Sequence, residues 1–263
     1  MDRVADVFEE VTFWSSRFGV FLLNHIELRR DIDVLDLGCA GGFPLIELAN
    51  MHGPSSRFIG LDIWGSALRR ARGKVEFQGL SNVHLVQGDA ASLPFCPSHF
   101  DLITSNLGVN NFENPDVALG ECARVARTGG RLVITTNLKG HMESFYDVFR
   151  AVVTEQCPER LPQLEENENH RGTRESVVER IEAAGFVVAR IVEDSLPLRF
   201  LDGSALLRHN LCQWFLLGWR EVVVEEDRLR VFAELERRLN VSAASRGELR
   251  MQVPMLYVEA TLP

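Results

Sequence analysis

An acidic residue stands directly before a glycine-rich turn near the start of the sequence. The stretch VLDLGCAGGFPLIELA, residues 34–49, reads as a buried strand, a turn and an apolar helix, with Asp36 at the end of the strand. Its glycines expose backbone N–H groups and let a ligand approach closely. A carboxylate at this place would repel a phosphate and attract a positive group. The pattern therefore predicts a site for a nucleotide-like ligand that carries a cation.

A dinucleotide cofactor is the first alternative, and the turn fits it poorly. Such a cofactor needs glycines spaced as GxGxxG, so that a pyrophosphate can sit at the N-terminus of the following helix. In GCAGGF, residues 38–43, the second glycine position is Ala40 and the third is Phe43. The carboxylate of Asp36 would also point toward the phosphates. The pattern therefore favours a ligand with a positive group.

Three further polar residues, Asp62, Asp89 and Asn106, stand at or near the ends of short apolar runs that read as strands. Amphipathic helices are predicted between these runs, and this alternation is typical of a parallel sheet with helices on both faces. Ligands of such sheets bind beyond the carboxyl ends of the strands. We therefore expect these three residues and Asp36 on one edge. The predicted strands are residues 32–38, 57–63, 83–89, 100–106, 131–137, 186–192 and 248–260.

The pattern changes in the second half of the chain. Residues 157–172 read as a polar, proline-broken loop, and residues 194–247 as a mostly helical insertion between the last two strands. A minimal sheet would join these strands by a short hairpin. Pro254 predicts that the last strand lies at an edge or carries a bulge. The predicted fold is a Rossmann-like α/β architecture, a seven-stranded, mostly parallel sheet with an antiparallel last strand and a helical cap inserted between strands six and seven.

The residues from Asp36 to Gly42 resemble the first motif of class I S-adenosylmethionine-dependent methyltransferases. That motif runs Asp/Glu-x-Gly-x-Gly-x-Gly, and the sequence here is DLGCAGG. Ala40 takes the place of the middle glycine, and its methyl group is expected to restrict the backbone there to negative φ. The resemblance extends through about residues 32–137. It is to the ubiquinone/menaquinone-biosynthesis type, which methylates small molecules.

The resemblance implies S-adenosyl-L-methionine as the cofactor. In the family, the first acid and the glycine turn cradle its aminoacid end, and the acid after the second strand, here Asp62, takes both ribose hydroxyls. A carboxylate suits that role because it can accept from two vicinal hydroxyls. The family packs apolar groups on adenine where Ile63 and Trp64 stand, and recognises the adenine amino group where Asp89 and Ala90 stand. The expected cofactor-binding residues are Asp36, Gly38, Ala40, Gly42, Asp62, Ile63, Trp64, Asp89, Ala90 and Asn106.

We expect a single methyltransferase domain over residues 1–263. Its predicted parts are an N-terminal helical lid over 1–31, a cofactor-binding core over 32–193, the helical cap over 194–247 and the last strand over 248–263. Within the cap, Leu229, Phe232, Leu235 and Leu239 recur at the spacing of a one-faced helix.

The acceptor side of the site is less clearly marked. Methyl transfer mainly needs the reacting groups held in line, and an acceptor that is not already an anion also needs a base. The catalytic candidates are His141, Asn110 and Tyr146, and the open alternatives are a histidine in water and an ordinary Asn-rich turn. The acceptor-binding candidates are Phe13, Trp14, Asn111, His209 and Trp214, with core packing or surface placement as the alternative.

Composition limits the partners. The net charge of −9 argues against nucleic acid as the acceptor. Five dispersed cysteines without a CxxC pair predict neither a metal site nor disulfides, which suits a cytoplasmic location. No apolar run reaches the roughly 20 residues of a membrane span.

The predicted reaction is methyl transfer to a small, apolar or aromatic metabolite, on carbon or oxygen, by a monomer or homodimer. One rival hypothesis is a non-catalytic regulatory protein that binds S-adenosylmethionine. The other is a methyltransferase that acts on protein or nucleic acid.

Overall fold

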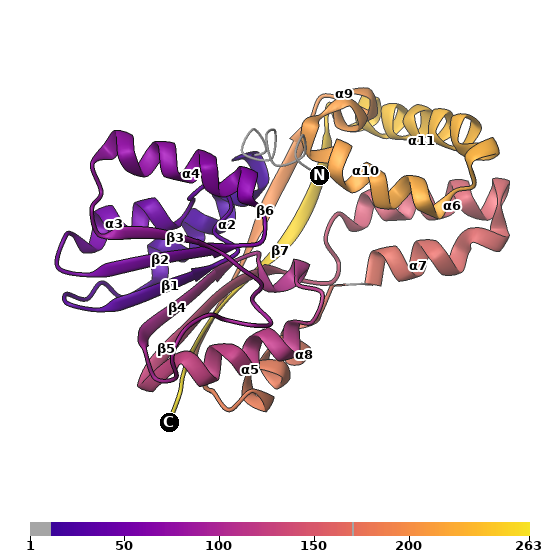
Figure 1. The fold of residues 1–263 in the computed structure, drawn as a ribbon. Coiled ribbons are helices and arrows are strands. Elements are labelled where there is room, and N and C mark those ends of the chain that lie inside the picture. The colour runs from indigo at the N-terminus through magenta and orange to yellow at the C-terminus, as the bar shows by residue number, and fades with distance from the viewer. Residues whose placement is uncertain (1–11, 170) are drawn as a thin grey trace. The chain divides into compact units, whose positions relative to one another are not determined.

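The computed structural model describes residues 12–169 and 171–263, and its centre is a seven-stranded sheet (Figure 1). The strand order is β3-β2-β1-β4-β5-β7-β6. The pairs β1–β2, β2–β3, β1–β4 and β4–β5 are parallel, and the last strands are antiparallel, which confirms the predicted fold. The strands are β1 Asp33–Leu37, β2 Arg57–Asp62, β3 Val83–Gln87, β4 Phe100–Asn106, β5 Ala126–Asn137, β6 Val187–Phe200 and β7 Leu249–Thr261.

The chain forms two compact units. Of the described residues, one unit comprises 12–136, 174–193 and 256–263, and the other comprises 137–169, 171–173 and 194–255. The described helices of the first unit are α2 Thr12–His25, α3 Leu45–His52, α4 Gly65–Gln78, the 3-10 turn η2 Val109–Asn111, α5 Pro115–Val125 and α8 Arg174–Ala183. Those of the second are α6 Glu143–Gln156, η3 Pro158–Arg160, α7 Leu161–Asn169, α9 Gly203–Arg208, α10 Asn210–Val222 and α11 Glu225–Arg246.

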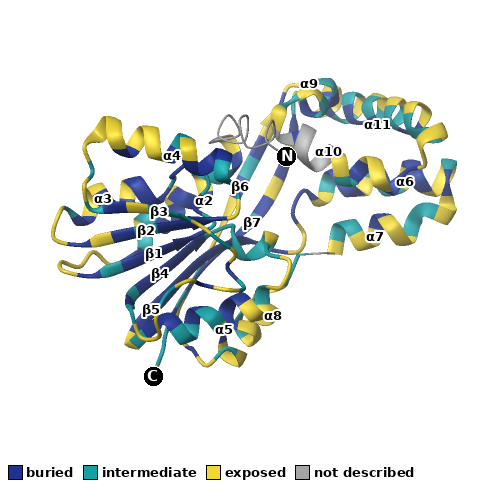
Figure 2. Cartoon of the chain, in the orientation of Figure 1, coloured by how far each residue is buried: buried dark blue, intermediate teal, exposed yellow. Residues whose placement is uncertain are grey.

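The central strands are buried on both faces, because helices cover both sides of this part of the sheet (Figures 1 and 2). Helices α3 and α4 lie on one side, and α5 and α8 on the other. Val34, Leu35 and Leu37 of β1 are almost fully buried. The register pairs Asp36 of β1 with Gly60 of β2 and with Thr104 of β4, so the carboxyl ends of these strands share one edge. This alignment sets the positions of the predicted site residues.

The second unit contains more helix than the sequence predicts. Residues 157–172 are not simply a loop, because η3 and α7 lie within them. Pro158 is the first residue of η3 and Pro162 is the second residue of α7, and a missing N–H costs little in the first turn of a helix. Leu164, buried in α7, supplies an apolar anchor. This unit therefore combines the predicted cap helices with α6 and α7.

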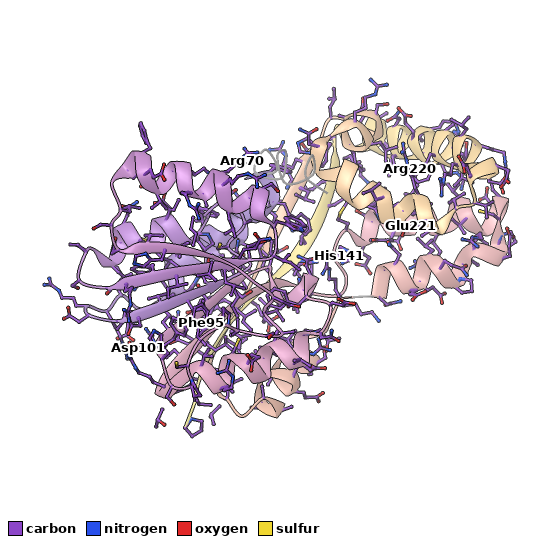
Figure 3. The ribbon with its side chains drawn as sticks, viewed as in Figure 1. Arg70, Phe95, Asp101, His141, Arg220 and Glu221 are labelled. Carbon is purple, nitrogen blue, oxygen red and sulfur yellow. The ribbon has the colours of Figure 1, made fainter. Side chains whose placement is uncertain are left out.

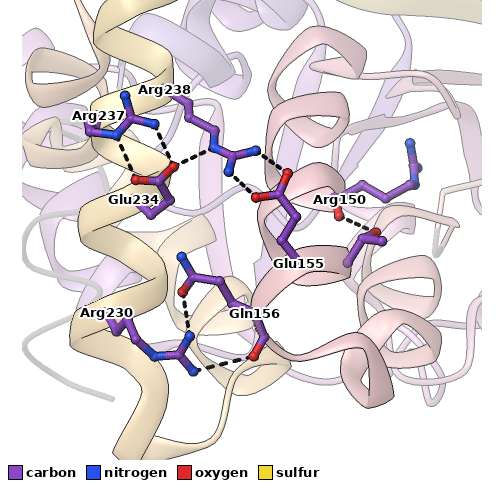
Figure 4. Close-up of polar contacts among 8 residues, drawn as sticks. Arg150, Glu155, Gln156, Arg230, Glu234, Arg237 and Arg238 are labelled. Atoms are coloured by element: carbon purple, nitrogen blue, oxygen red, sulfur yellow. Dashed lines mark hydrogen bonds and ion pairs between the residues drawn. The ribbon is translucent and has the colours of Figure 1, made fainter.

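Helix α11 packs through one apolar face. Val231, Leu235 and Leu239 are buried at four-residue spacing, whereas Leu229, predicted on this face, is 89% exposed. Helix α11 also makes ion pairs. Arg238 pairs with Glu155 of α6 and with Glu234 one helical turn away (Figure 4). Exposed pairs of this kind contribute little stability. The apolar face therefore carries most of the α6–α11 packing.

Pro254 does not lie on an edge strand. Strand β7 runs between β5 and β6, so the edge position is wrong, and the other alternative, a bulge, stays a prediction. The carbonyl of Pro254 accepts a hydrogen bond from Leu138 N–H at 3.1 Å, a contact that a proline can still make. None of the described helices is long and apolar enough to cross a membrane.

Helix α2 packs tightly on the segment that follows the glycine turn. A Cβ atom added at Gly19 would lie 2.1 Å from Cε1 of Phe43, so only glycine fits the ring at this place. Phe18 and Leu22 of the same helix are fully buried. The aromatic residue after the turn thus docks the N-terminal helix.

Replacing Gly19 with alanine should therefore destabilise the protein by about 1–3 kcal/mol, the usual cost of overpacking a core. Gly73, a helical glycine of α4 with no atom within 4 Å of an added Cβ, is the matched control. Gly73→Ala should stabilise the protein by roughly 0.5–1 kcal/mol through helix propensity. Urea unfolding of both variants measures the difference. Equal effects at the two positions would contradict the packing role of Gly19.

Candidate functional site

The glycine turn has three left-handed residues. The φ angles are +73° at Gly38, +44° at Ala40 and +100° at Gly42. The expectation that Ala40 keeps a negative φ is therefore wrong. Its N–H donates to Oδ2 of Asp62 at 2.8 Å, and this bond accounts for the unusual conformation. A hydrogen bond to a charged group is worth about 1.5–3 kcal/mol, which offsets the roughly 1–2 kcal/mol of left-handed strain.

Asp36 is an acid buried at the end of β1, with 1% exposure. Thr104 Oγ1 donates to its Oδ1 at 2.7 Å. Its Oδ2 has no hydrogen-bond partner among the described residues. Burial raises the pKa of Asp36 to about 7, against the opposing effect of the Thr104 hydrogen bond and with a further contribution from the charge of Asp62. A buried carboxylate with one unused oxygen is a ready partner for a cationic donor.

Asp62, at the end of β2, joins two loops. Its Oδ2 accepts from Ala40 N–H and its Oδ1 from Trp64 N–H, each at 2.8 Å. Burial raises its pKa, and the backbone hydrogen bonds from Trp64, Ala40 and Ile63 oppose that rise. A carboxylate has about four acceptor positions, so it can still accept from ligand hydroxyls.

The loop after β4 packs directly on the glycine turn. A Cβ added at Gly38 would lie 3.3 Å from Cα of Gly108. A Cβ added at Gly108 would lie 2.5 Å from Oγ of Ser105 and 2.8 Å from the carbonyl oxygen of Leu37. These glycines therefore bring the two loops into backbone contact.

Asn106 uses both ends of its amide within the protein. Its Oδ1 accepts from Thr135 Oγ1 at 2.8 Å, and its Nδ2 donates to the carbonyl of Ser15 in α2 at 3.2 Å. Its role as a direct cofactor ligand stays a prediction. These contacts fix α2 beside the ends of β4 and β5.

The other two asparagines of this loop also make internal bonds. Oδ1 of Asn110 accepts from Thr136 Oγ1, and Nδ2 of Asn111 donates to the carbonyl of Leu107 at 2.9 Å. Both bonds shape the turn, as the turn alternative expects. Their roles toward an acceptor stay predictions.

The residues expected around adenine stand on two adjacent loops. Ile63 is 62% exposed, and Trp64 is half-buried. Ala90 is buried, and the exposed Asp89 accepts from Ala91 N–H at 2.9 Å. The loops are tied by Gly88 N–H, which donates to the carbonyl of Asp62 at 3.1 Å. The structure thus brings together the predicted ribose and adenine positions.

Phe13 and Trp14 differ in exposure. Trp14 is 7% exposed and lies 5.8 Å from the ring of Phe18, centroid to centroid, so it belongs to the core of the first unit. Phe13 is 39% exposed. Of the two, Phe13 presents more surface to a ligand.

His141 and Tyr146 are buried neighbours in the second unit. Their ring centroids lie 5.6 Å apart, edge to face. The Tyr146 hydroxyl donates to Asn167 Oδ1 at 3.1 Å and accepts from Trp219 Nε1 at 3.2 Å. Burial raises the pKa of Tyr146 to about 12, so its phenol is neutral near pH 7.

The remaining acceptor candidates also belong to the second unit. His209 packs edge to face on Phe200, with 5.4 Å between ring centroids. Trp214 lies in α10, and its side chain is outside the described part of the chain.

Sequence reasoning missed Thr104 and Gly108, which complete the site. Thr104 could have been found from the spacing, because it lies two residues before Asn106 on the same face of β4. Gly108 gave no such signal, since a glycine after a strand is common in any turn.

The site fits the aminoacid and ribose parts of S-adenosylmethionine. The Asp36 oxygen that has no partner among the described residues suits an ammonium group, whereas the N–H of Gly38 already donates to the carbonyl of Leu61 at 2.8 Å. Asp62 retains acceptor capacity for vicinal hydroxyls. Asp36 and Asp62 are therefore the residues that would hold this cofactor, and the role of Gly38 stays a prediction.

Comparison with known proteins agrees with this geometry. A family model described as "Methyltransferase domain" matches residues 28–181. The chain is 29% identical to nocamycin O-methyltransferase of Saccharothrix syringae over 251 residues, which covers 92% of this chain and 89% of that protein. It is also 29% identical to demethylmenaquinone methyltransferase of Geobacillus stearothermophilus, over 71% of this chain and 89% of that protein.

A solved structure of an S-adenosylmethionine-dependent methyltransferase from Aquifex aeolicus has the same fold, with a TM-score of 0.56 and 22% identity. The match covers 72% of this chain and 91% of that one. The family model spans more than half of this chain and contains the whole glycine turn. The chain therefore belongs to the methyltransferase-domain family and is a class I S-adenosylmethionine-dependent methyltransferase.

Proposed function

We propose that this methyltransferase acts on a small, apolar or aromatic metabolite, and that oxygen is the attacking atom. The observation that carries the proposal is the alignment with nocamycin O-methyltransferase, which extends over 92% of this chain and 89% of that protein. The demethylmenaquinone methyltransferases support the same class of acceptor, a small molecule. Attack by carbon is the alternative.

The proposed cofactor roles follow the burial and hydrogen bonding of the first unit. S-adenosylmethionine, when bound, supplies an electrophilic methyl group on a sulfonium. Asp36 receives its ammonium group, the turn around Gly38 faces its aminoacid end, and Asp62 accepts from the ribose hydroxyls. The loop at Asp89 and Ala90 contacts the adenine.

The acceptor proton has two proposed fates. A phenol or enol that ionises in solution needs no base, because the anion itself attacks. An acceptor that stays neutral needs one, and His141 is the candidate. We assign Tyr146 a hydrogen-bonding role, since a phenol with a pKa of about 12 is a poor base at neutral pH.

Methyl-labelled S-adenosylmethionine tests the proposal directly. The enzyme is incubated with panels of phenols, enolised 1,3-dicarbonyl compounds and quinols, and release of S-adenosylhomocysteine is measured. Carbon NMR of a ¹³C-methyl product separates O-methyl from C-methyl groups. Labelling of protein or nucleic acid from a cell extract, without labelling of any small molecule, would overturn the small-acceptor proposal.

Substitution of Asp62 should weaken cofactor binding. Asp62→Ala removes the proposed acceptor of the ribose hydroxyls, and we expect a loss of about 1.5–3 kcal/mol. Calorimetric titration with S-adenosylhomocysteine measures the change. Unchanged affinity would remove Asp62 from the ribose role.

Cofactor affinity should depend on the protonation of Asp36. Its pKa of about 7 leaves the carboxyl mostly neutral at pH 5.5, so affinity for S-adenosylmethionine should rise about tenfold between pH 5.5 and 7. The α-ammonium of the ligand stays largely charged over this range, because α-amino groups titrate near pH 8. Calorimetry at both pH values measures the effect, and Asp36→Asn should abolish it. A pH dependence that survives in the variant would exclude Asp36 as its source.

The raised pKa of Asp36 also makes the free energy of unfolding of the ligand-free protein depend on pH, in the opposite direction to cofactor affinity. The pKa of Asp36 is raised from 3.8, so the folded protein holds a proton that the unfolded chain releases between about pH 4 and 7. The contribution of this group to the free energy of unfolding therefore falls as pH rises through that window. Unfolding of the ligand-free protein should show this slope, reduced in Asp36→Asn.

Restoring the middle glycine should stabilise the turn. Ala40→Gly removes the left-handed strain, and we expect a gain of roughly 0.5–1 kcal/mol after the added chain entropy of glycine. Ala151, an exposed alanine within α6, is the control, and Ala151→Gly should cost about 1 kcal/mol. Urea unfolding compares the two. Destabilisation by Ala40→Gly would mean that the alanine side chain makes contacts that outweigh its strain.

A further inference from the structure

The segment over residues 88–99 joins β3 to β4 and, as the structure describes it, contains no helix or strand. It begins with Asp89 and Ala90, where the adenine contacts are proposed. Such a segment has no repeating backbone hydrogen bonds of a helix or strand to fix its conformation. Its conformation must therefore be set by contacts with neighbouring elements.

Two charged side chains of α5 supply these contacts. Arg124 donates from Nη1 to the carbonyl of Phe95 at 2.8 Å and from Nη2 to the carbonyl of Leu93 at 3.0 Å. Glu121 accepts from Leu93 N–H through Oε2 at 2.8 Å. Phe95, labelled in Figure 3, also packs edge to face on Phe100, with 5.1 Å between centroids.

The two side chains also bind each other. Arg124 donates from Nε to Oε1 and from Nη2 to Oε2 of Glu121, each at 2.7 Å. The pair lowers the pKa of the Glu121 carboxyl and raises that of the Arg124 guanidinium, so both stay charged near neutral pH. Bidentate pairs of this kind fix orientation as well as distance. The pair is therefore a rigid clamp on the segment.

Backbone hydrogen bonds also hold the segment near both of its ends. On the β3 side, Gly88 N–H is bonded to the carbonyl of Asp62, and on the β4 side Ser98 N–H donates to the carbonyl of Arg124 at 3.0 Å. The side chain of Leu93 is 5% exposed. Asp89 and Ala90 thus lie between the end of β2 and the clamp, so a shift at residue 93 would move them.

We propose that Glu121 and Arg124 are positioning residues that set the base specificity of the cofactor site. They hold the segment so that Asp89 and Ala90 meet the exocyclic amino group of adenine. This inference rests on the proposed adenine contact of that loop. A role in folding alone would leave base preference unchanged.

The test compares two ligands that differ at one group of the base. S-adenosylhomocysteine carries the 6-amino group, and S-inosylhomocysteine carries a 6-oxo group in its place. Calorimetry gives the affinity ratio of the two ligands for each protein. Arg124→Met and the milder Glu121→Gln should reduce the preference for adenine by roughly fivefold, the effect of one misplaced hydrogen bond. Arg124→Lys should keep only part of the preference for adenine, because lysine cannot make the bidentate contacts.

The control is another ion pair of α5. Arg180 of α8 contacts Asp116 of α5 at 3.0 Å on the surface, and Arg180→Met should leave the ratio unchanged. Hydrogen exchange gives a readout without ligand: the Leu93 amide should exchange faster in Arg124→Met and not in Arg180→Met. Circular dichroism checks that each variant is folded.

The outcomes separate this inference from the proposed function. If Asp89→Ala loses the preference for adenine while Arg124→Met and Glu121→Gln keep it, the clamp is structural only and the inference fails. If Asp89→Ala itself keeps the preference, the proposed adenine contact is wrong. Loss of preference in all three, with Arg180→Met unchanged, supports the positioning role.

Discussion

The hydrogen bonds between the Asp62 carboxylate and the backbone N–H groups of Ala40 and Trp64 organise the cofactor site. One side chain thereby joins the glycine turn after β1 to the loop after β2, two segments that the sheet places side by side. The same bond holds Ala40 at φ +44°, a conformation that alanine adopts at a cost. The turn can therefore lack the usual middle glycine and keep its shape. Because each oxygen of Asp62 already has a backbone donor, its orientation is set before any ligand hydroxyl arrives, which limits the entropy lost on binding.

Asp36 gives the site its electrostatic character. It is buried, it has one hydrogen-bond donor in Thr104, and the charge of Asp62 opposes its ionisation. A cation would stabilise the ionised form of Asp36 and supply a donor for its unused oxygen. The ligand-free protein thus holds an acid whose charged form is costly, and that cost is relieved when a positive group binds. An anionic ligand would gain nothing from the same arrangement. This asymmetry is the physical basis on which we propose that Asp36 meets the ammonium group of S-adenosylmethionine.

Much of this site could be predicted from the sequence, because it depends on the ends of parallel strands. Asp36, Asp62 and Asn106 each follow an apolar run, and the topology alone brings such positions to one edge. The backbone of Ala40 could not be predicted, because a bond from a residue 22 positions away overrides the local preference of alanine. Helices η3 and α7 were missed because Pro158 and Pro162 suggest a loop until their first-turn positions are known. Pro254 suggested an edge strand or a bulge, and the edge position is wrong because a proline carbonyl can still accept a hydrogen bond within an interior strand. Predictions from local sequence failed where tertiary contacts set the backbone conformation.

The second unit lies largely beyond the part of the chain that the family model matches. The family model ends at residue 181, and the site that fits the cofactor lies within its limits. Helices α9, α10 and α11 lie beyond that limit, in the second unit. The alignment with nocamycin O-methyltransferase covers 92% of the chain, so it cannot stop at residue 181 and must include part of these helices. The alignment thus extends into a segment that the family model does not match. A fold shared by enzymes with many acceptors does not by itself determine the acceptor. The proposed acceptor therefore rests on a similarity that reaches into the second unit, and not on the cofactor-binding part of the chain alone.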